Sequence, residues 1–288
     1  MTHKPKPPFP PQPITPPGIE ANMNPKPQYQ ADSYKAAGKL KNKVALITGG
    51  DSGIGRSVAL LYAREGADIS LVFLPEEKED AEKVQQEIQT LGREVLLIPG
   101  DLKNAEFCQN VVANTMEHFK KIDILVNNAA FQKHQPNLDE LSIEQWNQTF
   151  MSNIYAYYYL CKFAVPHMKE GSAIINTGSI TGLEGSKELL DYSSTKGAIH
   201  AFTKSLAKNI VEKGIRVNCV APGPVWTPLN PAERNDKDIE NFGADTPMGR
   251  PAQPEEIAPA YVFLASNADS GYISGLIIPI LGGDTIAG

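Results

Sequence analysis

Short apolar runs alternate with longer amphipathic stretches along the chain from Lys43 onward. The short runs are rich in β-branched residues and lack the in–out alternation of a half-exposed sheet. They therefore predict strands that are buried on both faces. We expect these strands at 44–48, 69–74, 95–99, 122–127, 173–177, 215–220 and 276–280.

The stretches between the runs have the spacing of amphipathic helices. Strict alternation of strand and helix predicts an α/β fold, a single Rossmann-type doubly wound parallel sheet with helices on both faces and right-handed crossovers. No change in composition interrupts the chain after the first strand, so we expect one catalytic domain over residues 41–288. The helices are expected near 53–66, 76–92, 104–119, 140–169, 191–213 and 254–266.

The first forty residues have a different composition from the rest of the chain. Repeated prolines, as in KPKPPFPPQPITPPG, fix φ and remove backbone donors. They predict a proline-rich arm over residues 1–40 that is extended or disordered and contributes no packed core element. The arm could be a solvated tail. Alternatively, it could lie across a neighbouring subunit, anchored there by its apolar side chains Phe9, Ile14, Ile19 and Tyr29.

Composition and charge narrow the classes of function. The chain has 288 residues, 41% of them apolar, which suits one large α/β domain. Its formal charge of −6 without clustered Lys and Arg gives no indication of nucleic-acid binding. No apolar run reaches the ~18 residues that span a bilayer, and the N-terminus lacks a secretory h-region.

Cysteine and histidine usage adds two expectations. Three widely spaced cysteines fit a reducing compartment better than a disulfide framework, so we expect a cytoplasmic protein. The five histidines show no metal-ligand spacing and no CxxC or HExxH motif is present, so no metal is expected.

A glycine-rich turn, TGGDSGIG at residues 48–55, directly follows the first strand. In doubly wound sheets ligands bind at the carboxyl ends of the strands. Glycines there let the backbone approach a pyrophosphate, which the following helix N-terminus attracts. The spacing of Gly49, Gly53 and Gly55 is GxxxGxG and not GxGxxG, and a glycine cluster alone also fits a structural turn.

The stretch YSSTK places Tyr192 and Lys196 one helical turn apart. A tyrosine of ordinary pKa, near 10, is a poor base at neutral pH, and a neighbouring cation favours the phenolate and lowers that pKa. Ser179 follows the fifth strand, where its hydroxyl could donate to a developing oxyanion. It could equally cap a helix or turn.

Together TGGDSGIG, NNAA at 127–130, Ser179 and YSSTK resemble the short-chain dehydrogenase/reductases, over residues 40–285. Within that family the chain looks like bacterial glucose- or ribitol-dehydrogenase-like enzymes, some associated with general stress. The resemblance implies an oxidoreductase that transfers a hydride between a nicotinamide cofactor and the CH–OH or C=O group of a small alcohol, sugar, polyol or ketone.

The resemblance also implies roles for four residues. Tyr192 would be the general acid/base. Lys196 would hold the nicotinamide ribose and, together with the positive ring of an oxidised nicotinamide, lower the pKa of the tyrosine. Ser179 would donate to the substrate oxygen. Asn153 would support a water that connects the lysine to solvent, or would bond backbone in a helix bend. The family's NNAG reads NNAA here, so Ala130 replaces a glycine and could narrow the cofactor cleft.

The cofactor contacts that we expect lie on the strand ends and in the loops beyond them. The residues are Gly49, Asp51, Ser52, Gly53, Ile54, Gly55, Phe73, Leu74, Asp101, Leu102, Asn128, Ala129, Tyr192, Lys196, Pro222, Gly223, Val225 and Thr227.

The choice between NAD and NADP stays open in the sequence. The second strand does not end in the acidic residue typical of NAD enzymes. Negative charge at Asp51, Glu76 and Glu77 would repel a 2′-phosphate and favours NAD. Arg56, just after the glycine turn, is the one basic residue that could favour NADP instead.

Substrate selection is expected in a long polar connection, residues 226–253, which we interpret as a mobile lid. His134, in the loop after NNAA, is a further candidate for substrate contact. The aromatic stretch YAYYYL at 155–160 is typical of core or subunit interface. The resemblance implies a homo-oligomer, for which we expect a tetramer.

Two other functions remain possible on this scaffold. One is a cofactor-binding sensor or structural protein without turnover, which the intact Ser179, Tyr192 and Lys196 argue against. The other is a lyase or epimerase that recycles its cofactor, although such relatives tend to be longer and carry a different glycine turn.

Overall fold

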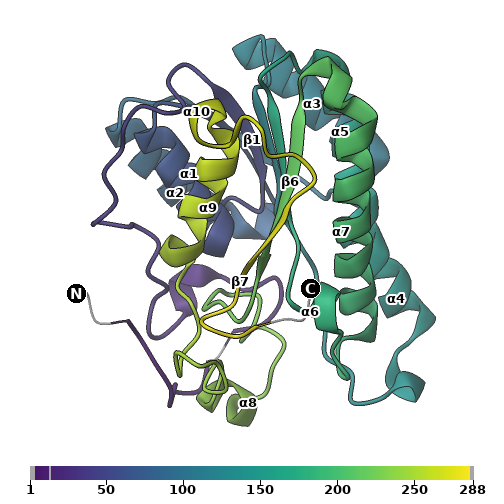
Figure 1. Cartoon of the computed structure of the whole chain (residues 1–288). Helices are drawn as coiled ribbons and strands as arrows, with labels where there is room; N and C mark the ends of the chain where they lie inside the picture. The colour runs from purple at the N-terminus through teal and green to yellow at the C-terminus, as the bar shows by residue number, and fades with distance from the viewer. Residues whose placement is uncertain (1–3, 13, 286–288) are drawn as a thin grey trace.

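The computed structural model describes residues 4–12 and 14–285. Residues 1–3 and 13 of the expected arm and residues 286–288 of the expected domain lie outside these ranges. Within them one parallel sheet has the strand order β3-β2-β1-β4-β5-β6-β7 (Figure 1), which confirms the predicted doubly wound fold. Its strands are β1 (Val44–Thr48), β2 (Asp68–Phe73), β3 (Val95–Pro99), β4 (Ile124–Asn127), β5 (Ala173–Thr177), β6 (Arg216–Pro222) and β7 (Ile277–Ile280).

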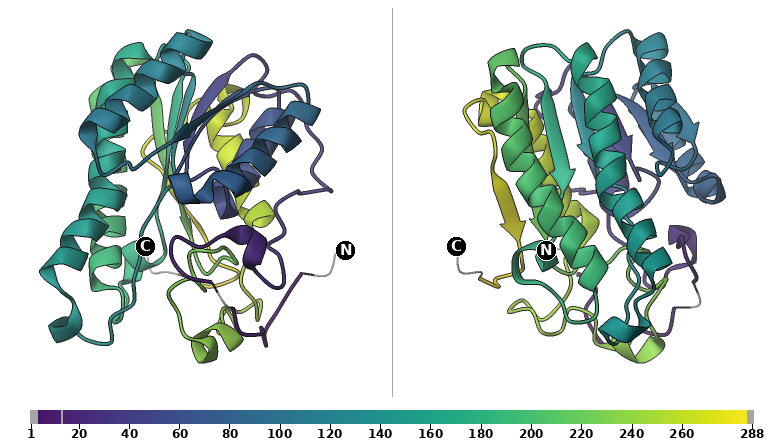
Figure 2. Two further views of the ribbon diagram at one scale, coloured as in Figure 1. Left: turned by 180° about the vertical axis from the view of Figure 1, so that it is seen from behind. Right: turned by 90° about the vertical axis from the view of Figure 1, so that its right-hand side faces the viewer.

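Two layers of helices cover the sheet, one on each face (Figures 1 and 2). On one face lie α1 (Gly53–Arg64), α2 (Lys78–Thr90), α9 (Pro254–Ala265) and the short α10 (Asn267–Ser270). On the other lie α3 (Ala105–Phe119), α4 (Ile143–Phe150), α5 (Ala156–Ala164) and α7 (Leu190–Ile210). Short elements connect these: α6 (Thr181–Glu184), α8 (Asp236–Glu240), and the 3₁₀ turns η1 (Glu20–Asn22), η2 (Pro75–Glu77), η3 (Leu138–Glu140), η5 (Val165–His167) and η6 (Val211–Lys213).

Burial on both faces explains why the strands lack an alternating pattern. Ala45 and Ile47 of β1 join the apolar cluster under α1 and α9. Leu46, between them, joins the cluster under α3, α5 and α7. Successive strand residues point to opposite faces, so a sheet covered twice needs apolar residues at every position.

The helix expected over 140–169 is interrupted. After α4 the backbone forms a π-helical turn, η4 (Met151–Tyr155), before α5 begins, and Pro166 lies in the 3₁₀ turn that ends α5. A π-helical turn inserts an extra residue into the helical ladder and is frequent at functional sites. Here it carries Asn153 on the inner side of the helix, fully buried.

The site lies where the strand order reverses. From β1 the chain moves outward to β2 and β3, then returns to β4 on the opposite side of β1. Connections therefore leave in opposite directions at the carboxyl ends of β1 and β4, which opens a crevice there. Such a crevice is where ligands bind in open α/β sheets.

The N-terminal arm corrects an expectation. It is extended apart from η1, but it lies against its own chain, beside the α8 segment (Figure 1). The Phe9 ring stacks on Trp226 with centroids 4.0 Å apart. Prolines restrict the unfolded chain and so lower the entropy lost on ordering. The buried set, which we name the arm–lid cluster, is Phe9, Ile14, Met23, Trp226, Ala232, Ile239 and Phe242.

Two of the anchors proposed for a neighbouring subunit, Phe9 and Ile14, are therefore buried within their own chain. The expectation of an arm without packed residues is wrong, because its few apolar side chains find a complementary surface on the lid.

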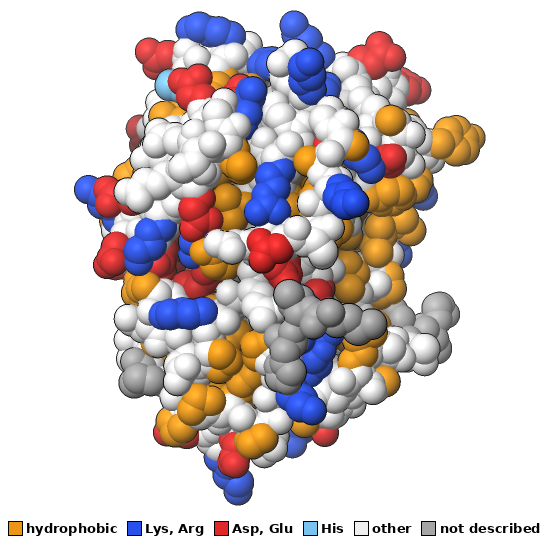
Figure 3. Space-filling model, turned by 90° about the vertical axis from the view of Figure 1, so that its left-hand side faces the viewer, with side chains coloured by type: hydrophobic (Ala, Val, Ile, Leu, Met, Phe, Trp, Pro, Cys, Tyr) orange, Lys and Arg blue, Asp and Glu red, His pale blue; other side chains and the backbone are white. Residues whose placement is uncertain are grey.

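On the side of the molecule shown in Figure 3, acidic and basic side chains are interspersed over the surface, without a continuous basic stripe.

Candidate active site

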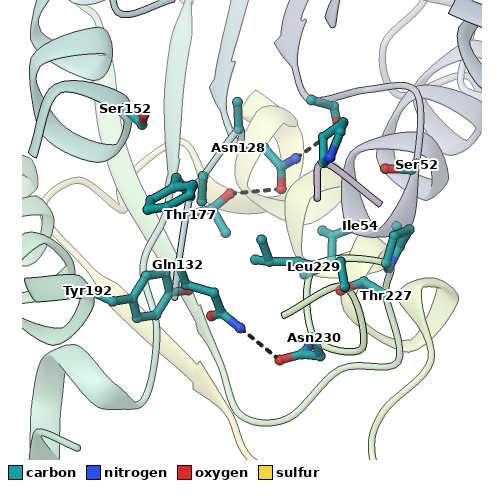
Figure 4. A pocket seen from close by; sticks show the side chains of 18 of the residues that line it. Ser52, Ile54, Asn128, Gln132, Ser152, Thr177, Tyr192, Thr227, Leu229 and Asn230 are labelled. Carbon is teal, nitrogen blue, oxygen red and sulfur yellow. Dashed lines mark hydrogen bonds between the residues drawn. The ribbon is translucent and has the colours of Figure 1, made fainter. Parts of the chain in front are cut away.

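A cavity of about 810 Å³ lies at the carboxyl ends of β1, β4 and β5, a size within the usual range of ligand sites. It brings together residues from the whole length of the chain (Figure 4). All the expected cofactor contacts except Gly55 line it, and so do Ser179, Tyr192 and Lys196. Asn153 is not among the lining residues.

The glycine turn is required by backbone geometry. Gly49 and Gly53 have φ of +59° and +50°, which side chains disfavour. A Cβ at Gly55 would stand 1.9 Å from the carbonyl oxygen of Gly49, so only glycine allows the turn to close. Gly55 therefore shapes the turn from behind, while Gly49 and Gly53 face the cavity.

The arm reaches the first residue of α1. Glu20 Oε2 accepts a hydrogen bond from the Gly53 N–H at 2.6 Å, and Glu20 Oε1 accepts one from Arg56 at 3.0 Å. Arg56 also donates to the Tyr29 hydroxyl and to Glu87, and its guanidinium lies 3.6 Å above the Tyr29 ring. Arg56 is thus held by the arm and α2, so the structure does not place it as the NADP-selecting cation considered from the sequence.

Acidic groups gather at the end of the cavity near the glycine turn. Asp51 is 2% exposed, lines the cavity, and its Oδ1 has no hydrogen-bond partner among the described residues. Burial, and then the charge of Glu77, raise the pKa of Asp51 well above its ordinary value. Burial likewise raises the pKa of Glu77 to about 7. An unpartnered buried acceptor suits a ligand hydroxyl, so these residues fit the ribose of a dinucleotide.

Asn128 ties the strand ends together under the cavity. Its side-chain amide donates to the carbonyl oxygens of Thr48 and Gly49 at 3.1 and 3.0 Å, and its Oδ1 accepts from Thr177 at 3.3 Å (Figure 4). This network fixes the β1, β4 and β5 ends relative to one another. The neighbouring Ala130 lines the cavity without displacing Asn128.

Tyr192 and Lys196 lie in the first turns of α7 and face the cavity. Lys196 Nζ donates to the Thr177 carbonyl oxygen at 2.7 Å and lies 5.3 Å from the centroid of the Tyr192 ring. Tyr192 lies close enough to Ser179, which follows the end of β5, for the serine hydroxyl to lower the pKa of its phenol. Asp191 secures the start of α7, because it accepts from the Tyr192 N–H and from Thr149 Oγ1.

The electrostatics of Tyr192 differ from the expectation. Burial raises its pKa above the ordinary value, the hydrogen bond with Ser179 lowers it, and the charge of Glu233 raises it further. Burial also lowers the pKa of Lys196 to about 8. The lowered tyrosine pKa was expected from Lys196 together with the positive nicotinamide ring of an oxidised cofactor. In the chain by itself, desolvation of the buried phenolate dominates and the net shift is upward.

Asn153 lies behind the loop that follows β4. Its Oδ1 accepts from the Phe131 N–H at 2.7 Å, and its Nδ2 donates to the Phe131 carbonyl at 2.8 Å and to Thr195 Oγ1 at 3.1 Å. Asn153 lies in the π-helical turn, but the backbone that it bonds belongs to the loop after β4 and not to its own helix. Asn153 connects the cavity loop to α7 directly. The role of supporting a water stays a prediction.

Several cavity residues were missed from the sequence. His134 was a candidate, but its partner Glu233 was not; the His134 ring Nδ1 lies 2.7 Å from Glu233 Oε1. Gln132 and Asn230, which also line the cavity, bond to each other at 3.2 Å. Pro16 and Pro17 of the arm line it too. Glu233 stands in the ordinary polar stretch AERND, and no local pattern marks it.

The described residues also bear on metal binding and on membrane insertion. Among the residues that the structure describes, no three or more His, Cys, Asp or Glu side chains are grouped so as to hold a metal ion. In the same part of the chain, every helix is too short or too polar to cross a bilayer.

Comparison with known proteins places the chain among oxidoreductases. A family model described as enoyl-(acyl carrier protein) reductase matches residues 49–285. General stress protein 39 of Bacillus subtilis is 50% identical over 270 residues, 94% of each chain. The glucose and ribitol dehydrogenase of Daucus carota is 45% identical over 286 residues, 97% of this chain and 98% of that one.

A solved structure agrees. The short chain dehydrogenase from Burkholderia cenocepacia J2315 in complex with NADP superposes with a TM-score of 0.80 at 30% identity, over 85% of this chain and 98% of that one. These matches confirm the resemblance predicted from the motifs. The chain therefore belongs to the short-chain dehydrogenase/reductase family of oxidoreductases.

Proposed function

We propose that this protein interconverts a CH–OH and a C=O group on a small alcohol, sugar, polyol or ketone, with Tyr192 as the general acid/base. The observation that carries the proposal is that Tyr192 and Ser179 line the same cavity as the glycine turn. The chemistry needs a proton donor and a dinucleotide site within one enclosure, and this placement supports both assignments.

The chain's own residues supply three functions. The raised pKa keeps the Tyr192 phenol protonated at neutral pH, which suits donation of a proton to a carbonyl oxygen. Ser179 donates a hydrogen bond to the same oxygen as negative charge develops there. Lys196, held by Thr177, keeps a buried positive charge beside the phenol. When bound, the nicotinamide supplies or accepts the hydride.

For oxidation of an alcohol, Tyr192 must first lose its proton. A positive charge near the phenol favours the phenolate, and Lys196 provides one such charge within the chain. Asn153 positions the loop that contains Phe131 against α7, and we propose that it acts through this contact.

We propose NAD as the preferred cofactor. The carboxyls of Asp51 and Glu77 line the cavity, and Arg56 is bound by Glu20 and Glu87. At this end of the cavity a 2′-phosphate would meet acidic groups, and the nearby Arg56 is already paired with Glu20 and Glu87. The residues expected to contact the dinucleotide otherwise remain those that line the cavity.

Three further expectations stay proposals. We retain the division into an arm over residues 1–40, a catalytic domain over 41–288 and a substrate lid near 226–253. We retain a cytoplasmic location. We also retain a homo-oligomer, a tetramer, for which the half-exposed rings of Tyr155 and Tyr158 on the α5 side offer an interface.

The test is a screen of sugars, polyols and small carbonyl compounds with each cofactor, followed by the absorbance of the reduced nicotinamide. We expect turnover of at least one secondary alcohol or carbonyl, faster with the NAD form. Tight cofactor binding without turnover of any compound would contradict the proposal and favour a sensor or structural role.

A further inference from the structure

A cluster of polar side chains stands in the cavity beyond Tyr192 and Ser179. Gln132 and His134 come from the loop after β4, and Asn230 and Glu233 come from the lid. We name these four residues the lid-end cluster. Figure 4 shows Tyr192 beside Gln132, whose amide points toward Asn230 across the cavity.

Hydrogen bonds fix the carboxylate of Glu233. Its Oε1 accepts from Gln132 Nε2 at 2.9 Å, and its Oε2 accepts from the His134 N–H at 2.8 Å. The His134 ring Nδ1 lies 2.7 and 2.9 Å from the two oxygens. Three N–H groups make these four contacts, because the His134 ring N–H is shared between the two oxygens. A carboxylate has about four acceptor positions, so it can accept one further donor.

Glu233 is an anion although it is buried. Its side chain is only 4% exposed, and burial alone would raise its pKa. The contacts with His134 outweigh burial and lower the pKa. Two cations stand near this end: Arg234, whose guanidinium lies 5.4 Å from the Phe242 ring centroid, and Lys196, which is bound to Thr177.

The carboxylate is close enough to the reacting end to influence it. Glu233 lines the same cavity as Tyr192 and Ser179, and its charge acts on the phenol. A substrate hydroxyl next to the reacting carbon can donate to such a carboxylate, which is a strong, charge-assisted hydrogen bond. A substrate carboxylate or phosphate in that place would meet a like charge in a poorly solvated site.

We propose that Glu233, positioned by His134 and Gln132, is a specificity-determining residue that selects neutral substrates with a hydroxyl beside the reacting group and rejects anionic ones. The inference rests on the proposed function and deepens it. A latch that only joins the lid to the β4 loop would need the same contacts but not the negative charge.

The experiment compares five-carbon substrates on the holoenzyme. Ribitol and 2-pentanol both contain a secondary alcohol, but only ribitol has neighbouring hydroxyls; ribonate adds a carboxylate. For Glu233→Gln we expect kcat/KM for ribitol to fall about 10- to 100-fold, the loss of one hydrogen bond to a charged group. The value for 2-pentanol should change much less, and the discrimination against ribonate should decrease.

Binding gives a second readout that does not depend on turnover. Ribitol is titrated by calorimetry into the Tyr192→Phe protein saturated with reduced cofactor, with and without Glu233→Gln. We expect weaker binding of ribitol in the double variant. Equal affinities together with equal losses for ribitol and 2-pentanol would overturn the proposal and leave only a latch.

Controls separate folding and the two levels of inference. Glu240→Gln makes the same chemical change at an exposed position of the lid and should behave as the unmodified protein. If Glu233→Gln does not fold, His134→Asn serves instead, with a smaller ribitol-specific loss. Turnover of 2-pentanol without any turnover of ribitol would overturn this inference alone, whereas no turnover of any alcohol or carbonyl would defeat the proposed function and the inference with it.

Discussion

The two ends of the cavity handle buried carboxyl groups in opposite ways. At the glycine-turn end, burial is the largest cause of the raised pKa of both Asp51 and Glu77, and the charge of Glu77 raises the pKa of Asp51 further. At the lid end, Glu233 is also buried, but its bonds to His134 lower its pKa.

The difference shows that burial is only one of the causes that shift the pKa of a carboxyl group. Desolvation raises the pKa at both ends, and the sign of the net shift depends on how strongly hydrogen-bond donors and cations oppose it. Glu77 accepts from the Leu74 N–H, yet its pKa is still raised to about 7, so this carboxyl changes charge near neutral pH. Glu233 has both His134 and Arg234 beside it and presents a negative charge near Tyr192.

The substitution with the largest expected effect on turnover lies at the reacting end of the cavity and leaves the glycine turn unchanged. Tyr192→Phe removes the only proposed proton donor, so turnover should fall on the order of 10²–10⁴-fold. Cofactor affinity, measured by fluorescence titration of the reduced nicotinamide, should change little because the glycine turn is untouched. Turnover close to that of the unmodified protein would refute the role of Tyr192.

Ser179→Ala changes the same end of the cavity, and we expect a smaller loss of turnover than for Tyr192→Phe. Loss of one donor to the developing oxyanion should lower kcat about 10²–10³-fold. Because the Ser179 hydrogen bond lowers the pKa of Tyr192, its removal raises that pKa. The rise of alcohol oxidation with pH should therefore move to higher pH, which a pH–rate profile measures. A profile that moves to lower pH would contradict the assignment.

Phe9→Ala removes the ring with which the N-terminal arm packs on Trp226 of the lid. Truncating a buried phenylalanine in a closed core lowers the free energy of unfolding by ~3–5 kcal/mol. The arm can separate from the lid, so we expect Phe9→Ala to lower that free energy by no more than this amount. Trp226 fluorescence during urea unfolding reports the loss, because Phe9 stacks on this ring. Phe263→Ala, at a position 37% exposed, is the matched control and should cost less.

An arm that contributes nothing to the cavity would leave cofactor affinity unchanged in the Phe9→Ala protein. We expect that affinity to weaken, because Pro16, Pro17 and Glu20 of the same arm lie at the glycine-turn end.

The smallest effect is a change of cofactor preference with pH. Glu77 has a pKa of about 7, so it is mostly neutral below that pH and mostly a carboxylate above it. Repulsion of a 2′-phosphate then grows as the pH rises, and the ratio of NADPH to NADH activity should fall through pH ~7.

Glu77→Gln should flatten this dependence, and Glu79→Gln, an exposed neighbour paired with Lys83, should not. Rates with both cofactors on each side of neutrality measure the ratio. A ratio that rises with pH in the unmodified protein would show that these carboxyls do not face the adenosine ribose.

Much of the fold and part of the site followed from local sequence. Uninterrupted apolar runs predicted strands covered on both faces, and the observed β1, with every residue buried, shows why. The helix over 140–169 was predicted as continuous because no glycine or proline between Ile143 and Val165 marks the π-helical turn. The arm was predicted to be unpacked because proline content describes backbone conformation and does not identify a binding surface.

By itself the sequence determined the parallel sheet, the glycine turn and the placing of Tyr192 and Lys196 on one face of a helix, because each depends on neighbours a few residues apart. Only the tertiary structure decided which charges stand together. His134 and Glu233 are 99 positions apart and Glu20 and Arg56 are 36 apart. No local pattern records such contacts, yet they lower the pKa of Glu233 and hold Arg56 against Glu20.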